Sequence, residues 1–94
     1  MAVDAGVIQR ARDHLASGHW IKDQASDGWG NNCAVGALRE YANCATYEEL
    51  KPYIELLQSF VPGGSLVSYN DLPETTLSDI VLVFDKGLAE LGAL

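Results

Sequence analysis

The chain has little of several residue types, and each shortage argues against a class of protein. It holds 6 basic residues against 13 acidic ones, which gives a formal net charge of −7. Because affinity for phosphate depends on Lys and Arg, we expect no direct binding of nucleic acid. The 2 cysteines, Cys33 and Cys44, do not have the ligand number or spacing of a zinc site, and we expect two free thiols. We expect no metal and no other cofactor.

Long apolar runs are also missing. No stretch reaches the roughly 18 apolar residues that a membrane-spanning helix needs. The first residues show no basic segment followed by an apolar one, so no secretory signal is visible. With 94 residues, 48% of them hydrophobic and 20% charged, the chain suits one modest core. We therefore expect a single domain over residues 1–94 that is cytoplasmic and stays out of the membrane.

Helical spacing of apolar residues dominates what is present. It predicts a first helix capped by Asp4 and ended by Ser17 and Gly18, and a last helix over residues 77–91. The last helix begins at a capping box formed by Thr76 and Asp79.

A third helical segment is interrupted by Pro52. Thr46 and Glu49 form a capping box in front of it. A proline this far into a helix removes a backbone hydrogen bond and crowds the preceding turn. We therefore expect a break, with a short turn over residues 47–51 and a new helix that begins at Pro52.

The central stretch of the chain is the helix predicted over residues 33–42. Asn32 is expected to cap it, Cys33 to be its first residue, and Asn43 to end it in a left-handed conformation. Gly36 lies among small residues, so another backbone can come close to this helix.

The remaining segments lack helical spacing. Residues 19–32 are interpreted as a small hairpin or an ordered loop, in which Trp20 and Trp29 pack over the core. Residues 65–69 are expected to be briefly extended and residues 70–73 to form a turn. The predicted fold is mainly α: a compact bundle of about four helices, with a small β-hairpin or ordered loop between the first two.

Cys33 is the main candidate for chemistry. The positive end of a helix dipole favours a thiolate, and His19 or His14 could act as its base, with Asp71 or Asn70 orienting the histidine. Against this, cysteine is among the most buried residue types, and the flanking residues do not match the papain-type signature. We favour a small packing residue, and hence no catalytic residue.

The other polar candidates have structural alternatives. Asn70 and Asp71 could bind a ligand, but such side chains commonly satisfy backbone groups near turns. Asp71 could also accept from the indole of Trp20 or Trp29, or from the first amides of the helix over residues 33–42. His14 and His19 are five residues apart, which is poor spacing for a metal site on a helix.

Acidic residues are concentrated in the second half of the chain. Residues 1–46 hold five acids and four bases, whereas residues 47–94 hold eight acids and two bases. Charge of this kind keeps a protein soluble, and it can also select a basic partner. Glu48, Glu49 and Glu55 are the predicted partner-binding residues.

Three pieces of the sequence together resemble a known family. They are a tryptophan-bearing loop, the run Cys33-Ala-Val-Gly36-Ala-Leu38, and Tyr69-Asn70-Asp71 followed by Thr76 and a final helix. The arrangement is similar to an uncharacterised family of small actinobacterial and actinophage proteins, over roughly residues 5–90. Tyr69 stands where that family is expected to have tryptophan. The resemblance implies a shared fold, with Trp20, Trp29, Cys33, Gly36, Asn70 and Asp71 as its structural motif, and it points to a phage or actinobacterial origin.

Two functions follow as hypotheses. The first is a small acidic interaction protein without catalytic activity that binds a host or viral protein, as a monomer or as a homodimer through Trp20, Trp29 or Tyr53. The alternative is a cysteine-dependent hydrolase or transferase that uses Cys33, His19 and Asp71.

Overall fold

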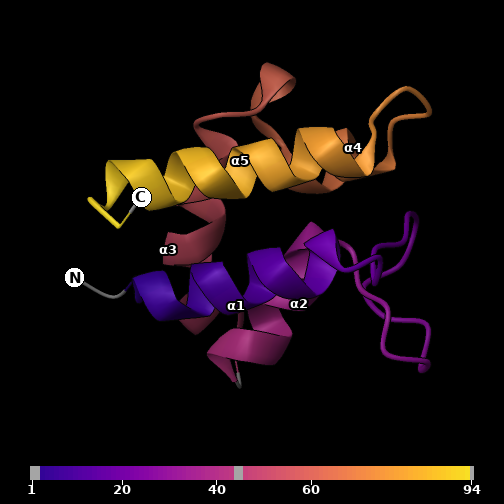
Figure 1. Ribbon diagram of the computed structural model, residues 1–94, viewed down its shortest axis with the longest axis horizontal. Coiled ribbons are helices and arrows are strands. Elements are labelled where there is room, and N and C mark those ends of the chain that lie inside the picture. The colour runs from indigo at the N-terminus through magenta and orange to yellow at the C-terminus, as the bar shows by residue number, and fades with distance from the viewer. Residues whose placement is uncertain (1–2, 44–45, 94) are drawn as a thin grey trace.

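The computed structural model describes residues 3–43 and 46–93, which form a mainly helical globule (Figure 1). Its helices are α1 (Ala5–Ala16), α2 (Ala34–Ala42), α3 (Tyr47–Gln58), the short 3-10 helix η1 (Pro62–Gly64), α4 (Leu66–Asp71) and α5 (Leu77–Glu90). The predicted mainly α class is confirmed. Within the described ranges the α-helices number five, against the four that the sequence predicted.

The segment between α1 and α2, residues 17–33, is an ordered loop, and the hairpin alternative is wrong. Trp20 and Ser26 each make one isolated bridge to Asn32, one parallel and one antiparallel. A hairpin needs two strands that pair antiparallel over several residues. Here neither pairing extends, and Asp23, with a φ of 70°, lies between the two bridging residues Trp20 and Ser26. No strand forms in the residues that the structure describes.

The additional helix is α4, where the sequence predicted an extended segment and a turn. Ser65 caps it, because the Ser65 hydroxyl accepts a hydrogen bond of 3.3 Å from the backbone N–H of Ser68. Leu66 and Asn70 are four residues apart and both are buried, so one face of this short helix enters the core. Asn70 and Asp71 are therefore the last residues of a helix rather than the start of a turn.

Helix α3 runs through Pro52 without the predicted break. Proline removes one hydrogen bond, and the carbonyl that loses it belongs to Glu48, which is exposed and can bind water instead. On the opposite face, the side chains of Tyr53, Ile54 and Leu57 are buried. Burial of such a side chain contributes about 1.5–3 kcal/mol, so three of them offset the roughly 3 kcal/mol cost of an internal proline.

The ends of the other helices follow the predicted caps, with one correction. The Asp4 carboxylate caps α1, Thr76 and Asp79 form the capping box of α5, and Asn43 ends α2 with a φ of 53°. Helix α2, however, is capped by Cys33 rather than by Asn32. The Cys33 sulfur accepts from the backbone N–H of Gly36 at 3.3 Å, so the helix begins one residue later than predicted.

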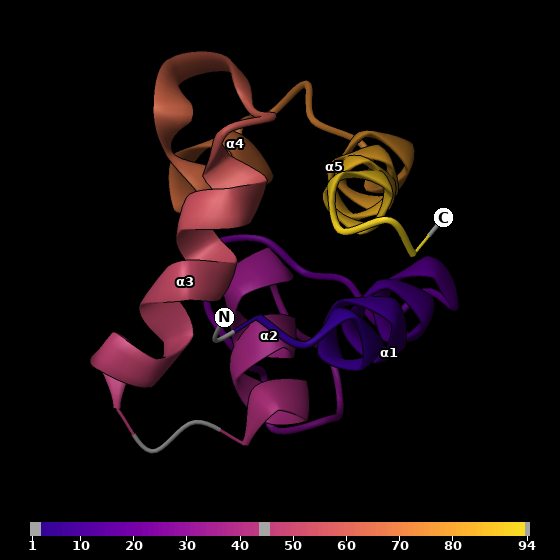
Figure 2. The same ribbon diagram turned by 90° about the vertical axis from the view of Figure 1, so that its left-hand side faces the viewer.

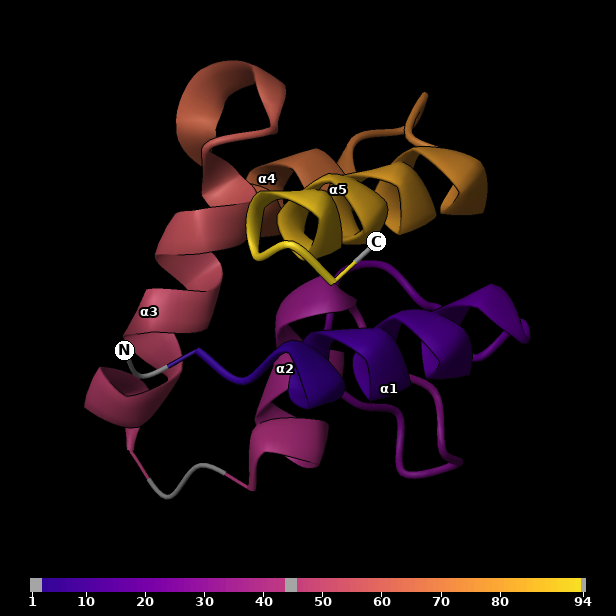
Figure 3. The ribbon, with the colours of Figure 1, turned by 60° about the vertical axis from the view of Figure 1, so that its left-hand side comes forward.

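Helices α1 and α5 run side by side in opposite directions, and α3 crosses them (Figures 1 and 2). Helix α2 packs against α1 and lies between α1 and α3 (Figure 3). The Cα radius of gyration of 11.8 Å is close to the roughly 12 Å of a compact domain of this size. The largest fully buried apolar side chains come from five helices: Ile8, Leu15, Leu38, Leu57, Leu66, Ile80, Phe84 and Leu88.

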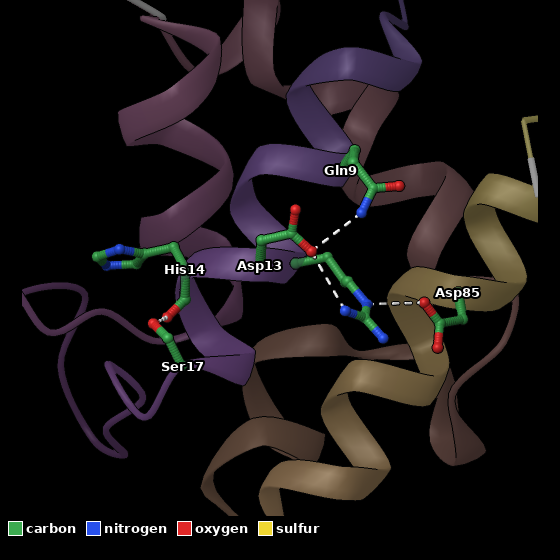
Figure 4. A network of polar contacts seen from close by, with 6 residues as sticks. Gln9, Asp13, His14, Ser17 and Asp85 are labelled. Carbon is green, nitrogen blue, oxygen red and sulfur yellow. Dashed lines mark hydrogen bonds and ion pairs between the residues drawn. The ribbon is translucent and has the colours of Figure 1, made fainter.

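A polar contact also joins α1 to α5. The guanidinium of Arg12 donates to Asp85 at 2.9 Å and to Asp13 at 3.2 Å, and Gln9 donates to the same Asp13 oxygen (Figure 4). The hydrogen bond to Asp85 is the main reason that the pKa of Arg12 is raised above its ordinary value. Both side chains of the Arg12–Asp85 pair are about a third exposed, so solvent screens the pair and its contribution to stability is small.

Candidate functional site

The α1–α2 loop is the part of the molecule that gathers the residues of interest. It extends from one end of the helical globule, beyond the C-terminus of α1 (Figure 1). Its two halves are held in different ways, one by α4 and α2 and the other by its own side chains.

Asn70, at the end of α4, holds the first half of the loop. It is 1% exposed, and its side-chain oxygen accepts from the Trp20 indole N–H at 2.7 Å and from the backbone N–H of Ala34 at 3.1 Å. Its amide nitrogen donates to the carbonyl of Ile21 at 3.1 Å and to Asp71 at 3.0 Å. One buried side chain thus connects the loop, the start of α2 and α4.

Asp71 takes part in this connection in a different way from the one predicted. The sequence suggested that Asp71 accepts from a tryptophan indole or from the first amides of α2, and Asn70 accepts both of these bonds instead. Asp71 accepts from the backbone N–H of Asp23 at 2.8 Å. The helical conformation of residues 70 and 71 decides this exchange, because consecutive helical residues point about 100° apart. Only Asn70 faces the interior.

Gly36 provides a second fixed contact between the loop and α2. A Cβ atom placed on Gly36 would overlap the carbonyl oxygen of Ala25 and lie 2.9 Å from its carbonyl carbon. The same oxygen accepts from the Asn32 side chain at 3.2 Å and from the backbone N–H of Cys33 at 3.4 Å. The backbone of the loop therefore lies directly on the first turn of α2, at the only residue type that leaves room for it.

His14 and Asn32 add a polar chain behind this contact. His14 Nε2 lies 3.0 Å from the side-chain oxygen of Asn32, and Nδ1 lies 3.2 Å from the Tyr41 hydroxyl. Both contacts are satisfied when Nε2 carries the hydrogen and Tyr41 donates to Nδ1. The His19 ring stacks on His14 with centroids 4.9 Å apart, and His19 also contacts Asn31. The rings of both histidines thus have hydrogen-bonding partners, with Asn32 and Tyr41 beside His14 and Asn31 beside His19.

Cys33 carries a free thiol and is 7% exposed. It lines a pocket of about 230 Å³ between the loop, α2 and α4, and Asp71 lines the same pocket. His19 is not among the described residues that line this pocket. The structure therefore brings Cys33 and Asp71 to one pocket and leaves the proposed base, His19, outside it. Cys44, whose thiol was also predicted to be free, lies outside the described residues.

Trp29 lies at the tip of the second half of the loop and is 85% exposed. The carboxylate of Asp27 holds the tip: it accepts from the backbone N–H of Trp29 at 2.7 Å, and from the backbone and side chain of Asn31 at 3.2 and 2.7 Å. The side-chain hydrogen bond from Asn31, followed by the backbone bond from Trp29, lowers the pKa of Asp27 below 3.8. The sequence predicted that both tryptophans pack over the core. Trp20 does so in part, whereas Trp29 does not.

The three predicted partner-binding residues are all exposed on α3. Glu48 and Glu55 are seven residues apart and share a face, and Glu49 is adjacent to Glu48. Lys51 is exposed on the same helix. Tyr53, proposed above for a homodimer surface, is instead 5% exposed, and its hydroxyl accepts from the backbone N–H of Asp4 at 3.0 Å.

Tyr69 precedes Asn70 and packs partly against the core. Burial, and secondarily the nearby carboxylate of Asp79, raise the pKa of the Tyr69 hydroxyl above 10.0.

The sequence did not single out Asp23 or Arg39, and it predicted for Asn32 only the role of a helix cap. Asp23 and Arg39 line the pocket beside Cys33, and Asn32 supports the loop through His14 and Ala25. Arg39 follows Val35 by four residues, so both lie on one face of α2. This spacing is the one sequence signal that could have placed Arg39 near the pocket. The positive φ of Asp23 was not predicted, because Asp23 does not follow a helical pattern as Asn43 does, and its backbone N–H is bonded to Asp71, which is distant in sequence.

These features define a small helical protein whose α1–α2 loop is attached by the buried Asn70 and by a close backbone contact at Gly36. The chain belongs to a family of unknown function (DUF6197), whose model matches residues 1–90. No curated protein and no solved structure matches the chain.

Two classes of site find no support within the described part of the chain. No group of three or more His, Cys, Asp or Glu side chains there could hold a metal ion. Within residues 3–43 and 46–93, no helix is long and apolar enough to cross a membrane.

Proposed function

We propose that the protein is a small interaction protein without catalytic activity that binds another protein, and that Trp29 anchors the complex. Trp29 is 85% exposed, although tryptophan is the residue with the largest apolar surface. Tryptophan is enriched among the residues that dominate the free energy of protein association.

The hydrogen bonds around Asp27 support this role. They hold the backbone of Trp29 and Asn31 in one conformation before any partner binds. A segment that is already ordered loses less conformational entropy on binding, so more of the contact energy appears as affinity.

Glu48, Glu49 and Glu55 are proposed to attract a partner with a basic surface. Exposed charges of one sign mainly increase the rate of association and select among partners. Helix α3 lies on the other side of the molecule from the α1–α2 loop (Figure 1), so the two surfaces can be tested separately. Because the motifs resemble those of small actinobacterial and actinophage proteins, we propose a host or viral protein as partner.

The test compares three variants with the wild type in pull-downs from an actinobacterial lysate, quantified by mass spectrometry. Trp29→Ser is expected to reduce capture of a defined partner at least about ten-fold, since losing an anchor costs 2 kcal/mol or more. Replacement of Glu48, Glu49 and Glu55 by lysine is expected to weaken capture most at low salt. Leu82→Ser is the control, because Leu82 is an exposed apolar residue, 52% exposed, on another element.

The outcomes separate the two parts of the proposal. A partner captured equally by wild type and Trp29→Ser would contradict the role of Trp29. Equal capture by the triple lysine variant would contradict the role of the acidic surface. Light scattering of the purified protein at several concentrations distinguishes a monomer from a homodimer that uses Trp29.

A cysteine-dependent hydrolase or transferase is the second candidate. It is favoured by one observation, the shared pocket of Cys33 and Asp71. Alkylation by iodoacetamide between about pH 5 and pH 9, mapped by mass spectrometry with Cys44 as comparison, tests it. We expect Cys33 to react only after denaturation, because it is 7% exposed. Fast reaction of Cys33 in the folded protein near pH 6 would instead favour the enzyme.

A further inference from the structure

The pocket beside Cys33 contains charges of both signs. Asp23 comes from the α1–α2 loop, Arg39 from α2 and Asp71 from α4. The pocket has a volume of about 230 Å³, and its lining exposes more apolar than polar surface. Sites for small molecules typically combine an apolar lining with a few polar groups that fix the ligand.

Helices α2 and α4 each contribute one apolar and one charged residue to the lining of the pocket. In α2, Val35 is followed four residues later by Arg39, and in α4, Val67 is followed four residues later by Asp71. Residues at this spacing share a helix face, so each helix presents one apolar and one charged side chain to the pocket. Val67 is 50% exposed, as expected for an apolar side chain at an open site.

The opposite charges are separated along α2. The first residue of α2, Ala34, is bonded to Asn70 at 3.1 Å, which places Asp71 at the start of this helix. Arg39 follows five residues later, about 7 Å along the axis at 1.5 Å per residue. Among the described residues, Arg39 forms no ion pair with Asp23 or Asp71. The pocket thus has an acidic end and a basic end that do not neutralise each other.

The acidic end is held in place by hydrogen bonds. One oxygen of Asp71 accepts from the backbone N–H of Asp23 at 2.8 Å and from Asn70 at 3.0 Å. Both bonds go to that oxygen, so the other carboxylate oxygen is available for a ligand. Asp23 has a φ of 70°, a conformation that costs energy in most residues and is often found at binding sites.

We propose that this pocket binds a small zwitterion of the amino-acid class. Its ammonium group would bind Asp23 and Asp71, its carboxylate would bind Arg39, and its carbon skeleton would lie against Val35 and Val67. The volume is below the roughly 300 Å³ at which pockets for drug-sized ligands begin, so the ligand is the size of one amino acid or a dipeptide. An arginine that binds a carboxylate with two parallel hydrogen bonds gives this end its selectivity.

The test is a titration of the isotope-labelled protein followed by NMR shifts of the backbone amides around the pocket. The ligands are glycine, γ-aminobutyrate and alanyl-alanine, in which the ammonium and the carboxylate are separated by an increasing number of bonds. Methylammonium and acetate are the singly charged controls. We expect saturable shifts at millimolar concentration for at least one zwitterion, and at least about ten-fold weaker binding of both controls. If none of the zwitterions binds, or if methylammonium or acetate binds as tightly, the proposal is wrong.

Two variants assign the ends of the ligand. Arg39→Gln and Asp23→Asn are each expected to weaken zwitterion binding at least about ten-fold. Asparagine tolerates the positive φ at position 23, and the Asp23 backbone N–H that binds Asp71 is kept, so the fold is preserved. Lys51→Gln, which removes an exposed charge on α3, is the control and is expected to bind normally. Unchanged affinity in both pocket variants would overturn the assignment. Because Trp29 is not a lining residue, Trp29→Ser tests the interaction function without affecting this result.

Discussion

Trp20 and Trp29 lie in one loop, nine residues apart, and have opposite environments. The Trp20 indole N–H is bonded to Asn70 at 2.7 Å, and the ammonium of Lys22 lies 5.4 Å from the ring centroid. Trp29 is 85% exposed. The comparison shows that residue type does not decide the role of a tryptophan here. The contacts of the surrounding backbone do.

The two halves of the loop differ in what holds them. Around Trp20, the backbone of Ile21 and Asp23 is bonded to Asn70 and Asp71, about fifty residues away in sequence. Around Trp29, the bonds from Asp27 reach only two and four residues along the chain. The first half is therefore part of the tertiary structure, and the second is a local turn that displays its central side chain.

Gly36→Leu gives the largest expected effect, because it removes the contact on which the loop rests. Even the Cβ would overlap the Ala25 carbonyl, which is backbone and cannot move without displacing the loop, so we expect a cost above the roughly 1–3 kcal/mol that is typical of overpacking, and above that of the other variants. We expect a large fall in the urea midpoint, or an unfolded protein. Gly6→Ala is the control, since its new Cβ meets only side-chain ends, those of Arg10 and Asp4, each at 3.1 Å, and no backbone atom. An unchanged midpoint in Gly36→Leu would mean that the loop does not depend on α2.

Asn70→Ala tests the attachment of the Trp20 half directly. It leaves the indole N–H of Trp20 and the backbone N–H of Ala34 without their acceptor. Each orphaned buried donor costs about 1–3 kcal/mol, so we expect a loss of roughly 2–4 kcal/mol in the free energy of unfolding. Trp20→Phe removes only one of the two donors and is expected to cost less. Equal stability of Asn70→Ala and wild type would refute the role of Asn70 as the attachment point.

Acid is expected to break the bonds that hold the Trp29 half, because their acceptor is the Asp27 carboxylate, whereas the Trp20 indole is bonded to the neutral amide of Asn70. The pKa of Asp27 is lowered from 3.8 in the folded protein, so its hydrogen bonds contribute stability above that pH, and this is lost as pH falls through the lowered pKa. NMR should show Asp27 titrating below 3.8 together with the Asn31 side-chain amide, while the Trp20 indole resonance stays in place. Simultaneous change of both signals would show that the halves are not independent.

Trp29→Ser is expected to have the smallest effect on stability, within about 0.5 kcal/mol, as is usual for an exposed side chain. Trp20→Ser is the matched variant and is expected to cost clearly more, because it loses both packing and a hydrogen bond. Thermal unfolding of the two variants gives the comparison. A similar cost at both positions would show that Trp29 also contributes to the folded core.

Local patterns in the sequence predicted most of the helical framework. The caps at Asp4 and Thr76, the left-handed end at Asn43 and the mainly α class depend on neighbouring residues, and these predictions are confirmed. The continuous α3 was not predicted, because the cost of Pro52 is local whereas the burial that offsets it comes from other helices. Helix α4 was missed for the same reason, since Leu66 and Asn70 are buried only after the globule forms.

The sequence by itself determined the helical fold class and the family, and it singled out Gly36, Asn70 and Asp71 as structural residues. Only the tertiary structure decided which of two adjacent polar residues faces the interior, which of two tryptophans is exposed, and which charges share a pocket. Spacing along a helix fixes the face on which a residue lies. What that face meets is fixed by contacts between segments about fifty residues apart, such as that between Trp20 and Asn70.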